Sequence, residues 1–222
     1  MRDKNRLIFW GASGQAIVLE EFLAMSHKIE VIFDNNKNIK SPFKDTKIYY
    51  GKSGFIKWLS NKKKNYSFIV AIGGDKGKDR VLISKYLIKN KLTPFSAINK
   101  NSNIANNVTL GDGVQIMMGV SIGARCKIGN YVILNTSSSI DHECNIAEGC
   151  HIAPGAILAG KISVDKYSLI GTGAVVLPNI KIGKECVIGA GSVITKNVPD
   201  FSVVYGNPAK IKGKTNEWNR KI

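Results

Sequence analysis

Two histidines stand nine residues apart in residues 135–156, which read NTSSSIDHECNIAEGCHIAPGA. An imidazole titrates near neutral pH, so His142 and His151 could each accept a proton from an attacking nucleophile. His142 lies between two carboxylates, Asp141 and Glu143, and either could orient or polarise its ring. The alternative is a pair of ordinary solvent-exposed histidines, and the choice depends on the elements that hold them.

An aliphatic residue recurs at every sixth position in the second half of the chain. The series runs through seventeen consecutive hexads without an insertion: Ile98, Ile104, Leu110, Ile116, Ile122, Ile128, Leu134, Ile140, Ile146, Ile152, Leu158, Val164, Ile170, Val176, Ile182, Ile188 and Ile194. A period of six predicts a parallel β-helix, in which each hexapeptide buries its apolar side only against its neighbours. Three hexads make a triangular coil, so the series predicts five to six coils stacked about 4.8 Å apart.

This coil predicts where the histidines lie. Stacking by three hexads places His142 between two small residues, Ala124 and Gly160. The hexad position of His142 points outward, so we expect its imidazole at the base of a notch. His151 also points outward, but on a different face of the same prism. The two rings could meet only across adjoining prisms, so a joint functional role predicts a homotrimer with sites between subunits.

A metal site is the weaker interpretation of the histidines. The prism holds only two of them, and the third histidine of the chain, His27, falls in the N-terminal region. Three imidazoles around a zinc ion with an open position are therefore not available, and we expect no metal.

The four cysteines share one position of the repeat. They all stand four residues after an aliphatic hexad residue, at the inward position that Val, Ser or Ala fill elsewhere: Cys126, Cys144, Cys150 and Cys186. We expect them to be core packing residues, with neither a disulfide framework nor a metal site. The inward position also argues against Cys144 as a nucleophile beside His142.

Residues 1–97 lack the six-residue period and predict a nucleotide-binding α/β domain. The apolar runs LIFW (7–10), EVIF (30–33) and SFIVAIG (67–73) predict strands. Helix-like segments follow the first run (IVLEEFLAM) and the last (RVLISKYLIKN), a shorter one covers 55–59, and the chain from Asp34 to about Gly54 looks irregular. The length suits a Rossmann-like half-domain, so one nucleotide is a better ligand than a dinucleotide.

The turn GASGQA, residues 11–16, follows the first expected strand and opens a helix. Backbone N–H groups at such a helix N-terminus can receive phosphate, although a tight strand-to-helix turn alone would explain the glycines. Asp34 ends the second strand, where it could accept hydrogen bonds from a ribose or base, or merely cap a turn.

The net charge and the apolar runs limit the classes of partner that we expect. The formal charge is +16, yet the lysines are scattered and the densest cluster, Lys62–Lys64, has one aromatic neighbour, so nucleic acid is not the expected partner. The excess suits a general attraction for anionic metabolites. Apolar runs are far shorter than a membrane span and no secretory signal is recognisable, so we expect a cytoplasmic protein without a membrane partner.

Several segments together resemble the bacterial sugar acyltransferases of the left-handed β-helix superfamily. They are NTSSSIDHEC, HIAPGA, IGTGAVVLPNIKIG, IGAGSVITKNVP and YGNPAK, preceded by GASGQA and VAIGG. The resemblance extends to about Lys212. Within this superfamily the chain is similar to one branch, which contains the UDP-4-amino-sugar N-acetyltransferases of the bacillosamine pathway and the sialic acid O-acetyltransferases.

The resemblance implies three regions and a reaction. Residues 1–97 would bind a nucleotide-linked amino sugar, residues 98–199 would form a left-handed β-helix, and residues 200–222 would close the CoA site. Acetyl-CoA would donate the acetyl group to the 4-amino group of an acceptor of the UDP-4-amino-4,6-dideoxy-N-acetylglucosamine type. His142 matches the family's general base, and Glu143 matches the acidic neighbour that raises its basicity.

The resemblance also implies binding residues. Those matching the acetyl-CoA site are Asn135, His151, Gly160, Thr172 and Ala190, where the Gly160 N–H would face the thioester oxygen. Those matching the acceptor site are Ser13, Gly14, Gln15, Asp34, Asn35 and Gly73.

Two positions depart from the family. Members of the bacillosamine pathway usually carry His where this chain has Gln15, and Asp where it has Asn35. Both lie in the acceptor site, so they affect the identity of the sugar or its nucleotide rather than acetyl transfer. A sugar O-acetyltransferase of the sialic acid type and a non-catalytic β-helical binding module remain the alternatives.

Overall fold

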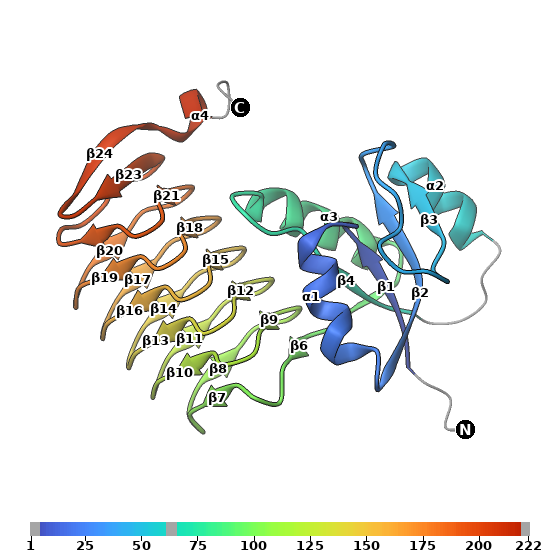
Figure 1. Ribbon diagram of the computed structural model, residues 1–222, viewed down its shortest axis with the longest axis horizontal. Coiled ribbons are helices and arrows are strands. Elements are labelled where there is room, and N and C mark those ends of the chain that lie inside the picture. The colour runs from blue at the N-terminus through green and yellow to red at the C-terminus, as the bar shows by residue number, and fades with distance from the viewer. Residues whose placement is uncertain (1–4, 61–65, 219–222) are drawn as a thin grey trace. The chain divides into compact units, whose positions relative to one another are not determined.

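The computed structural model describes residues 5–60 and 66–218 (Figure 1), so the Lys62–Lys64 cluster lies outside the described residues. The chain divides into two compact units, one formed by residues 1–72 and 79–97 and the other by residues 73–78 and 98–222. The second unit thus includes a short segment from within the first ninety-seven residues, which the sequence analysis placed in a single N-terminal domain. We call this segment, Gly73–Lys78, the arm.

The first unit is a parallel sheet with helices between its strands (Figure 1). Its strands lie in the order β3-β2-β1-β4-β5, and every neighbouring pair is parallel. The elements are β1 (Asn5–Trp10), α1 (Gly14–Leu23), β2 (His27–Asp34), β3 (Ile48–Tyr50), α2 (Gly51–Leu59), β4 (Ser67–Val70), α3 (Gly77–Lys89) and β5 (Thr93–Pro94). The strands β3 and β5 were not predicted, because three and two residues are too few to show a periodicity.

Aromatic rings fill the core of this unit. Trp10 at the end of β1 is 1% exposed, and its ring centroid lies 5.5 Å from that of Phe33 and 5.9 Å from that of Phe55. Phe33 also contacts Trp58 edge-on, with centroids 5.5 Å apart. Tilted and edge-to-face pairs of this kind add to the burial of apolar area. The core therefore fixes the carboxyl ends of β1 and β2, where the expected nucleotide-binding residues lie.

The second unit is a parallel β-helix built from two-residue strands (Figure 1). Each of the seventeen aliphatic hexad residues is the second residue of one strand: β6 (Ala97–Ile98), β7 (Asn103–Ile104), β8 (Thr109–Leu110), β9 (Gln115–Ile116), β10 (Ser121–Ile122), β11 (Lys127–Ile128), β12 (Ile133–Leu134), β13 (Ser139–Ile140), β14 (Asn145–Ile146), β15 (His151–Ile152), β16 (Ile157–Leu158), β17 (Ser163–Val164), β18 (Leu169–Ile170), β19 (Val175–Val176), β20 (Lys181–Ile182), β21 (Val187–Ile188) and β22 (Val193–Ile194). The strands form three sheets, and partners such as Ile122 and Ile140 are 18 residues apart in sequence. The predicted coil is confirmed.

The corners of the coil use left-handed backbone. At the corner between β13 and β14 the residues one coil apart all have positive φ: Arg125 (60°), Glu143 (58°), Lys161 (60°) and Asn179 (62°). The equivalent residue of the corner between β14 and β15 is Gly149 (71°), which stacks under Tyr167 (64°). A non-glycine residue adopts this conformation at a cost, so the stacked coils must stabilise it.

A hairpin ends the prism. The strand β23 (Ser202–Gly206) pairs in parallel with β21 and antiparallel with β24 (Ala209–Lys214), and the short helix α4 (Thr215–Trp218) follows. The pairing covers the last coil of one sheet, which would otherwise present open backbone groups.

Candidate functional site

His142 lies in the turn between β13 and β14. Its Nδ1 is 3.1 Å from Oε2 of Glu143, and the side chains of the two residues are 50% and 41% exposed. Asp141 accepts the backbone N–H of His142 through Oδ1 at 2.7 Å, which fixes the turn beneath the ring. The imidazole is thus outward and accessible, with one ring nitrogen facing a carboxylate. A proton on Nδ1 leaves Nε2 as the free base.

The notch around His142 is formed by small residues, as the coil predicts. The backbone N–H of Glu143 donates to Ala124 O at 2.8 Å, and that of Lys161 donates to His142 O at 2.9 Å, so the three turns stack directly. A Cβ added to Gly160 would lie 2.6 Å from Cε1 of the His142 ring and 3.0 Å from Cδ2. The imidazole therefore rests over Gly160 because that residue has no side chain.

The backbone N–H of Gly160 has no acceptor among the residues that the structure describes. Its neighbour Lys161 donates to His142 O, and Ala159 donates to Val176 O at 3.1 Å. A backbone N–H left without an acceptor beside an imidazole can stabilise an oxyanion that forms there.

His151 is outward, as expected, but it is not exposed. It occupies the outer position of β15 and is 6% exposed, which removes the alternative of a solvent histidine at this position. Its Nε2 lies 3.3 Å from Nδ2 of Asn135, and its Nδ1 lies 3.4 Å from the carbonyl oxygen of Gly74 in the arm. The structure thus brings two of the expected donor-site residues, Asn135 and His151, into contact.

Thr172 and Ala190 lie on the same prism, at the corner that contains Asn135. Both are exposed, and the N–H of Gly191 donates to Thr172 O at 2.8 Å, so the two residues stack one coil apart. The expected donor-binding residues other than Gly160 therefore lie along one corner or next to it, whereas His142 lies at the following corner.

Five of the six expected acceptor-site residues lie at the carboxyl ends of β1 and β2: Ser13, Gly14, Gln15, Asp34 and Asn35. Asp34 accepts the N–H of Ala12 through Oδ2 at 2.9 Å and that of Asn36 through Oδ1 at 2.8 Å. Its carboxylate therefore does cap the loop, and unused lone pairs on both oxygens remain for a ligand. Ser13 is the N-cap residue of α1, and Gly14 and Gln15 form its first turn. Gly73 begins the arm and packs with the second unit.

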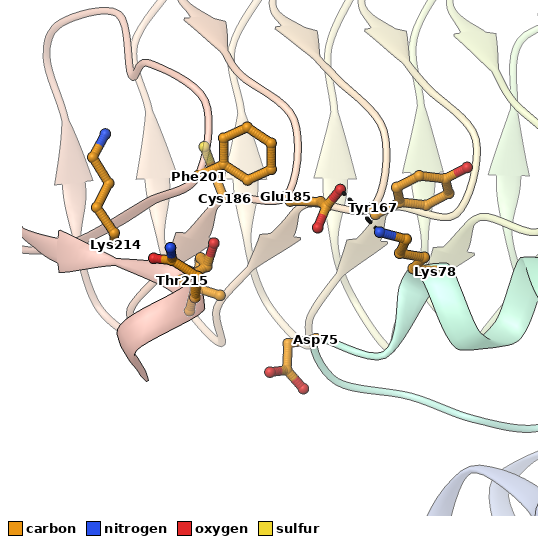
Figure 2. A pocket seen from close by; sticks show the side chains of 10 residues that line it. Asp75, Lys78, Tyr167, Glu185, Cys186, Phe201, Lys214 and Thr215 are labelled. Atoms are coloured by element: carbon orange, nitrogen blue, oxygen red, sulfur yellow. Dashed lines mark ion pairs between the residues drawn. The ribbon is translucent and has the colours of Figure 1, made fainter. Parts of the chain in front are cut away.

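A cavity of about 470 Å³ lies beside the arm within the second unit (Figure 2). Lys78 extends from the arm toward Glu185, and the two charged groups are 3.7 Å apart. Tyr167 lies beside this pair in the figure, while Phe201 and Lys214 line the wall formed by the C-terminal hairpin. None of these five residues was expected at a site. The glycine-rich sequence GGDKGK was the one available signal of a close backbone approach.

The cysteines are buried and reduced, as predicted. All four are free thiols with at most 1% exposure. Burial raises the pKa of the Cys144 thiol to about 11, so it is protonated at neutral pH. A thiol of this kind is a poor nucleophile, which agrees with its inward position.

Within the described residues, no group of three or more His, Cys, Asp or Glu side chains could hold a metal ion. No helix in the described part of the chain is both long enough and apolar enough to span a bilayer.

Comparison with known proteins supports the fold and the class of chemistry. The family described as bacterial transferase hexapeptide (six repeats) matches residues 107–142 and 161–196. No curated protein sequence matches the chain. PerB from Caulobacter crescentus, solved with CoA and GDP-perosamine, is similar at 29% identity over 94% of this chain and 98% of that chain, with a TM-score of 0.84.

Other solved structures agree. The acetyltransferase domain of PglB from Neisseria gonorrhoeae, solved with acetyl coenzyme A, is 25% identical over 95% of this chain and 100% of that chain, with a TM-score of 0.82. WeeI from Acinetobacter baumannii, at 23% identity over 94% of this chain and 100% of that chain, has a similar fold with a TM-score of 0.81. The repeat and the three parallel sheets fit a left-handed β-helix preceded by an α/β region. The protein is an acyltransferase, and its residues 107–142 and 161–196 match the hexapeptide-repeat family.

Proposed function

We propose that the protein transfers the acetyl group of acetyl-CoA to the 4-amino group of a nucleotide-linked amino sugar. The observation that carries this proposal is the imidazole of His142, which rests over Gly160 with Nδ1 facing Glu143. Similar proteins have been solved with CoA and GDP-perosamine or with acetyl coenzyme A, which supports this donor and this class of acceptor.

His142 acts as the general base. The Glu143 carboxylate accepts a hydrogen bond from the Nδ1–H group and stabilises the imidazolium that forms when Nε2 takes a proton from the attacking amine. A positioned base of this kind contributes about 10²–10⁴-fold to the rate. Because the amine attacks the thioester directly, no covalent enzyme intermediate is needed, and the buried thiol of Cys144 plays no part.

Gly160 supplies the oxyanion donor. Attack on the thioester puts negative charge on its carbonyl oxygen, and the N–H of Gly160 lies beside the base with no acceptor among the described residues. One such donor contributes on the order of 10²–10³-fold. The thiolate of CoA leaves as the tetrahedral intermediate collapses, and the proton held by His142 is available to it.

The first unit binds the nucleotide of the acceptor as a Rossmann-like half-domain. The parallel order β3-β2-β1-β4-β5 agrees with the first five strands of the doubly wound nucleotide-binding order. In such sheets ligands bind outside the carboxyl ends of the strands where the order reverses, which here is between β1 and β4. Ser13, Gly14 and Gln15 follow β1, and Gly73 follows β4.

Three copies of the chain complete the sites. The outer column of one sheet carries Ile157 at 49% exposure, and the flanking corners carry Met118 at 54% and Leu177 at 41%. Exposed apolar side chains at these three positions favour burial against another copy. A threefold arrangement would bring the His142 corner of one prism toward the Asn135 corner of the next.

The test is release of free CoA thiol from acetyl-CoA with UDP-, dTDP- and GDP-linked 4-amino sugars, with a hydroxyl-bearing sialic acid as the O-acetylation arm. We expect turnover with one amino sugar. The variant His142→Ala should lose at least about 100-fold in kcat with that acceptor, because the base is gone, while its oligomeric mass stays that of the native protein.

The variant His27→Ala is the matched control, since this half-buried ring contacts Phe95 edge-on in the first unit, with centroids 4.7 Å apart. It should retain native turnover. Native turnover by His142→Ala would contradict the assignment of His142 as the general base. Turnover with sialic acid and with no amino sugar would mean that the protein is an O-acetyltransferase.

A further inference from the structure

The cavity beside the arm is formed by three segments of the second unit (Figure 2). Asp75 and Lys78 come from the arm, Tyr167 and Glu185 come from one corner of the prism, and Lys214 comes from the C-terminal hairpin. The volume of about 470 Å³ falls within the range of roughly 300–1,000 Å³ that is usual for small-molecule sites. Among the described residues, none of those expected to bind acetyl-CoA or the acceptor lines this cavity. A ligand here would therefore occupy a site of its own.

Two aromatic rings line the cavity from the same corner of the prism. The N–H of Glu185 donates to the carbonyl oxygen of Lys166, the neighbour of Tyr167, at 2.8 Å. The N–H of Phe201 donates to the carbonyl oxygen of Lys184, the neighbour of Glu185, at 2.9 Å. Tyr167 and Phe201 therefore lie two coils apart, about 10 Å along the prism, and Glu185 lies between them (Figure 2).

Both rings are fixed at the cavity wall. Phe201 is 37% exposed and has a left-handed φ of 58°, which a bulky residue adopts at a cost. Nζ of Lys184, a side chain that does not line the cavity, lies 5.0 Å from the centroid of the Phe201 ring and holds the ring from outside. The hydroxyl of Tyr167 donates to Oε2 of Glu148 at 3.3 Å. The cavity thus presents an exposed aromatic face that a ligand does not have to order when it binds.

The charged side chains around the rings balance one another. Nζ of Lys78 lies 3.7 Å from Oε1 of Glu185, and Asp75 and Lys214 add one charge of each sign. An anion in the cavity would face two carboxylates. A wholly apolar ligand would remove water from four charged groups without replacing the lost hydrogen bonds. An uncharged ligand with many polar groups meets neither cost.

A sugar ring has the groups that this lining requires. Lys214 only donates hydrogen bonds and Asp75 only accepts them, whereas the hydroxyl of Thr215 and the amide of Asn216 do both. Each hydroxyl of a sugar also donates and accepts. The C–H groups on the face of the sugar ring are apolar and suit the negative face of an aromatic ring.

We propose that the cavity binds an uncharged saccharide of one or two rings, whose C–H face lies on the ring of Phe201 and whose hydroxyls bond to Asp75 and Asn216. This site is distinct from the one proposed for the nucleotide-linked acceptor. The proposal does not rest on the proposed function, because saccharide binding is measured without acetyl transfer.

The first test is saturation-transfer NMR of the full chain with the methyl glycosides of D-glucose, D-mannose and D-galactose, each beside the methyl glycoside of the matching uronic acid. We expect at least one neutral glycoside to bind saturably with a dissociation constant on the order of 1 mM, as suits so small a ligand. Its uronic acid should bind at least about threefold more weakly, because the added carboxylate meets Asp75 and Glu185.

Indole serves as the apolar probe in the same experiment. The proposal is overturned by an absence of saturable binding for all three neutral glycosides up to about 20 mM. Binding of indole alone, or tighter binding of the uronic acids than of the neutral glycosides, overturns it as well.

The aromatic face is tested by Phe201→Leu, which keeps an apolar side chain and loses the flat ring. We expect the dissociation constant of the best glycoside to rise at least about fivefold, with the thermal melt of the variant recorded on the same preparation. The matched control is Tyr205→Leu, because Tyr205 is 41% exposed on β23 and has Nζ of Lys212 5.5 Å from its ring centroid, but does not line the cavity. The control should bind the glycoside as the native protein does. Native affinity in a folded Phe201→Leu protein would refute stacking on this ring.

The charge balance is tested by the double variant Asp75→Asn/Glu185→Gln, which leaves only the two lysines of the lining charged. We expect the preference to reverse, so that the uronic acid binds at least as tightly as the neutral glycoside. The control Glu20→Gln/Glu21→Gln changes the net charge by the same amount on α1 and should keep the native preference. An unchanged preference in the cavity variant would contradict the site.

The variant Asp34→Ala separates the cavity from the acceptor site. It should bind the glycoside with native affinity, whereas a loss of binding would place the saccharide at the acceptor site and end the proposal. If no amino sugar is ever acetylated, the proposed function fails, while the titrations with Phe201→Leu and Asp34→Ala still decide whether the cavity binds a saccharide.

Discussion

The imidazole of His142 depends on a neighbour that has no side chain. The ring rests over Gly160, and the carboxylate of Glu143 faces its Nδ1, so three residues from two coils set the position of one nitrogen. Because a general base must lie within hydrogen-bond reach of the proton that it takes, a shift of about 1 Å is costly. The position of the ring is therefore as much a property of Gly160 as of His142.

We expect Gly160→Ala to lower kcat about 10- to 100-fold without lowering stability. The added methyl would meet Cε1 of His142 at 2.6 Å, and that ring can swing away, so the fold loses nothing. Steady-state kinetics and a thermal melt of the same preparation give both values.

The contrasting variant is Gly123→Ala, at the same corner but two coils before Gly160 and one coil before Asp141. Its Cβ would meet backbone, with His142 N at 2.8 Å and Asp141 C at 3.0 Å, so the collision cannot be relieved by a side-chain rotation. This variant should lose roughly 1–3 kcal/mol of stability. A Gly160→Ala protein that melts early with native kcat would contradict the role assigned to Gly160.

At the scale of the elements, the aliphatic residues that recur every six positions form the core of the prism. Each two-residue strand from β9 to β22 contributes one buried aliphatic residue to the interior, whereas Ile98 in the first coil is 43% exposed. The residue four positions later also points inward, where the four cysteines lie. Desolvation raises the pKa of Cys126, Cys144 and Cys186 above the ordinary value for a thiol. The reactive thiolate form is therefore scarce at neutral pH.

We expect the native protein at about pH 8 to react with none of its four thiols on the timescale of minutes, when probed with a charged aromatic disulfide reagent. In denaturant all four should react, because unfolding exposes them and returns each pKa to its usual range. A thiol that reacts quickly in the native protein would contradict the inward position of the cysteines.

The elements differ in how far the sequence predicts them. The β-helix was predicted strand by strand, because stacking forces each hexad to repeat the same burial. In the first unit the sequence indicated β1, β2, β4 and the helices, but β3 and β5 were missed because they are very short. Likewise His151 was predicted to point outward, but its burial depends on Gly74, a glycine 77 residues earlier that no local pattern connects to it.

At the scale of the whole molecule, the proposed site residues of one chain lie at two different corners of the prism. His142 lies at one corner, and Asn135, Thr172 and Ala190 lie at the preceding one. The outer column of the sheet between them carries Ile157, Val175 and Val193 in its later coils and Asn103, Ser121 and Ser139 in its first coils. The outer column of the next sheet carries Lys127, Asn145, Ser163 and Lys181. Apolar and polar faces on the same prism indicate which face another copy would cover.

We expect the native protein to sediment with three times its chain mass of 24.2 kDa. The variant Ile157→Asp should lower that mass and the turnover together, because a buried unpaired carboxylate weakens the interface. Asn145→Asp, on the polar face, is the control and should leave both unchanged. Analytical ultracentrifugation of the three proteins decides; a native monomer with full activity would contradict sites between subunits.

The repeated left-handed corners have a consequence for the growth of such a chain. One corner of the prism has the same backbone turn in every coil, at Arg125, Glu143, Lys161 and Asn179. Each coil therefore adds the same height to the prism, about 4.8 Å. Insertion or deletion of whole coils, each of three hexads, would lengthen or shorten the prism without rotating any of its faces. Evolution could thus change the reach between the histidine corner and the terminal hairpin only in discrete steps, leaving the orientation of both ends intact.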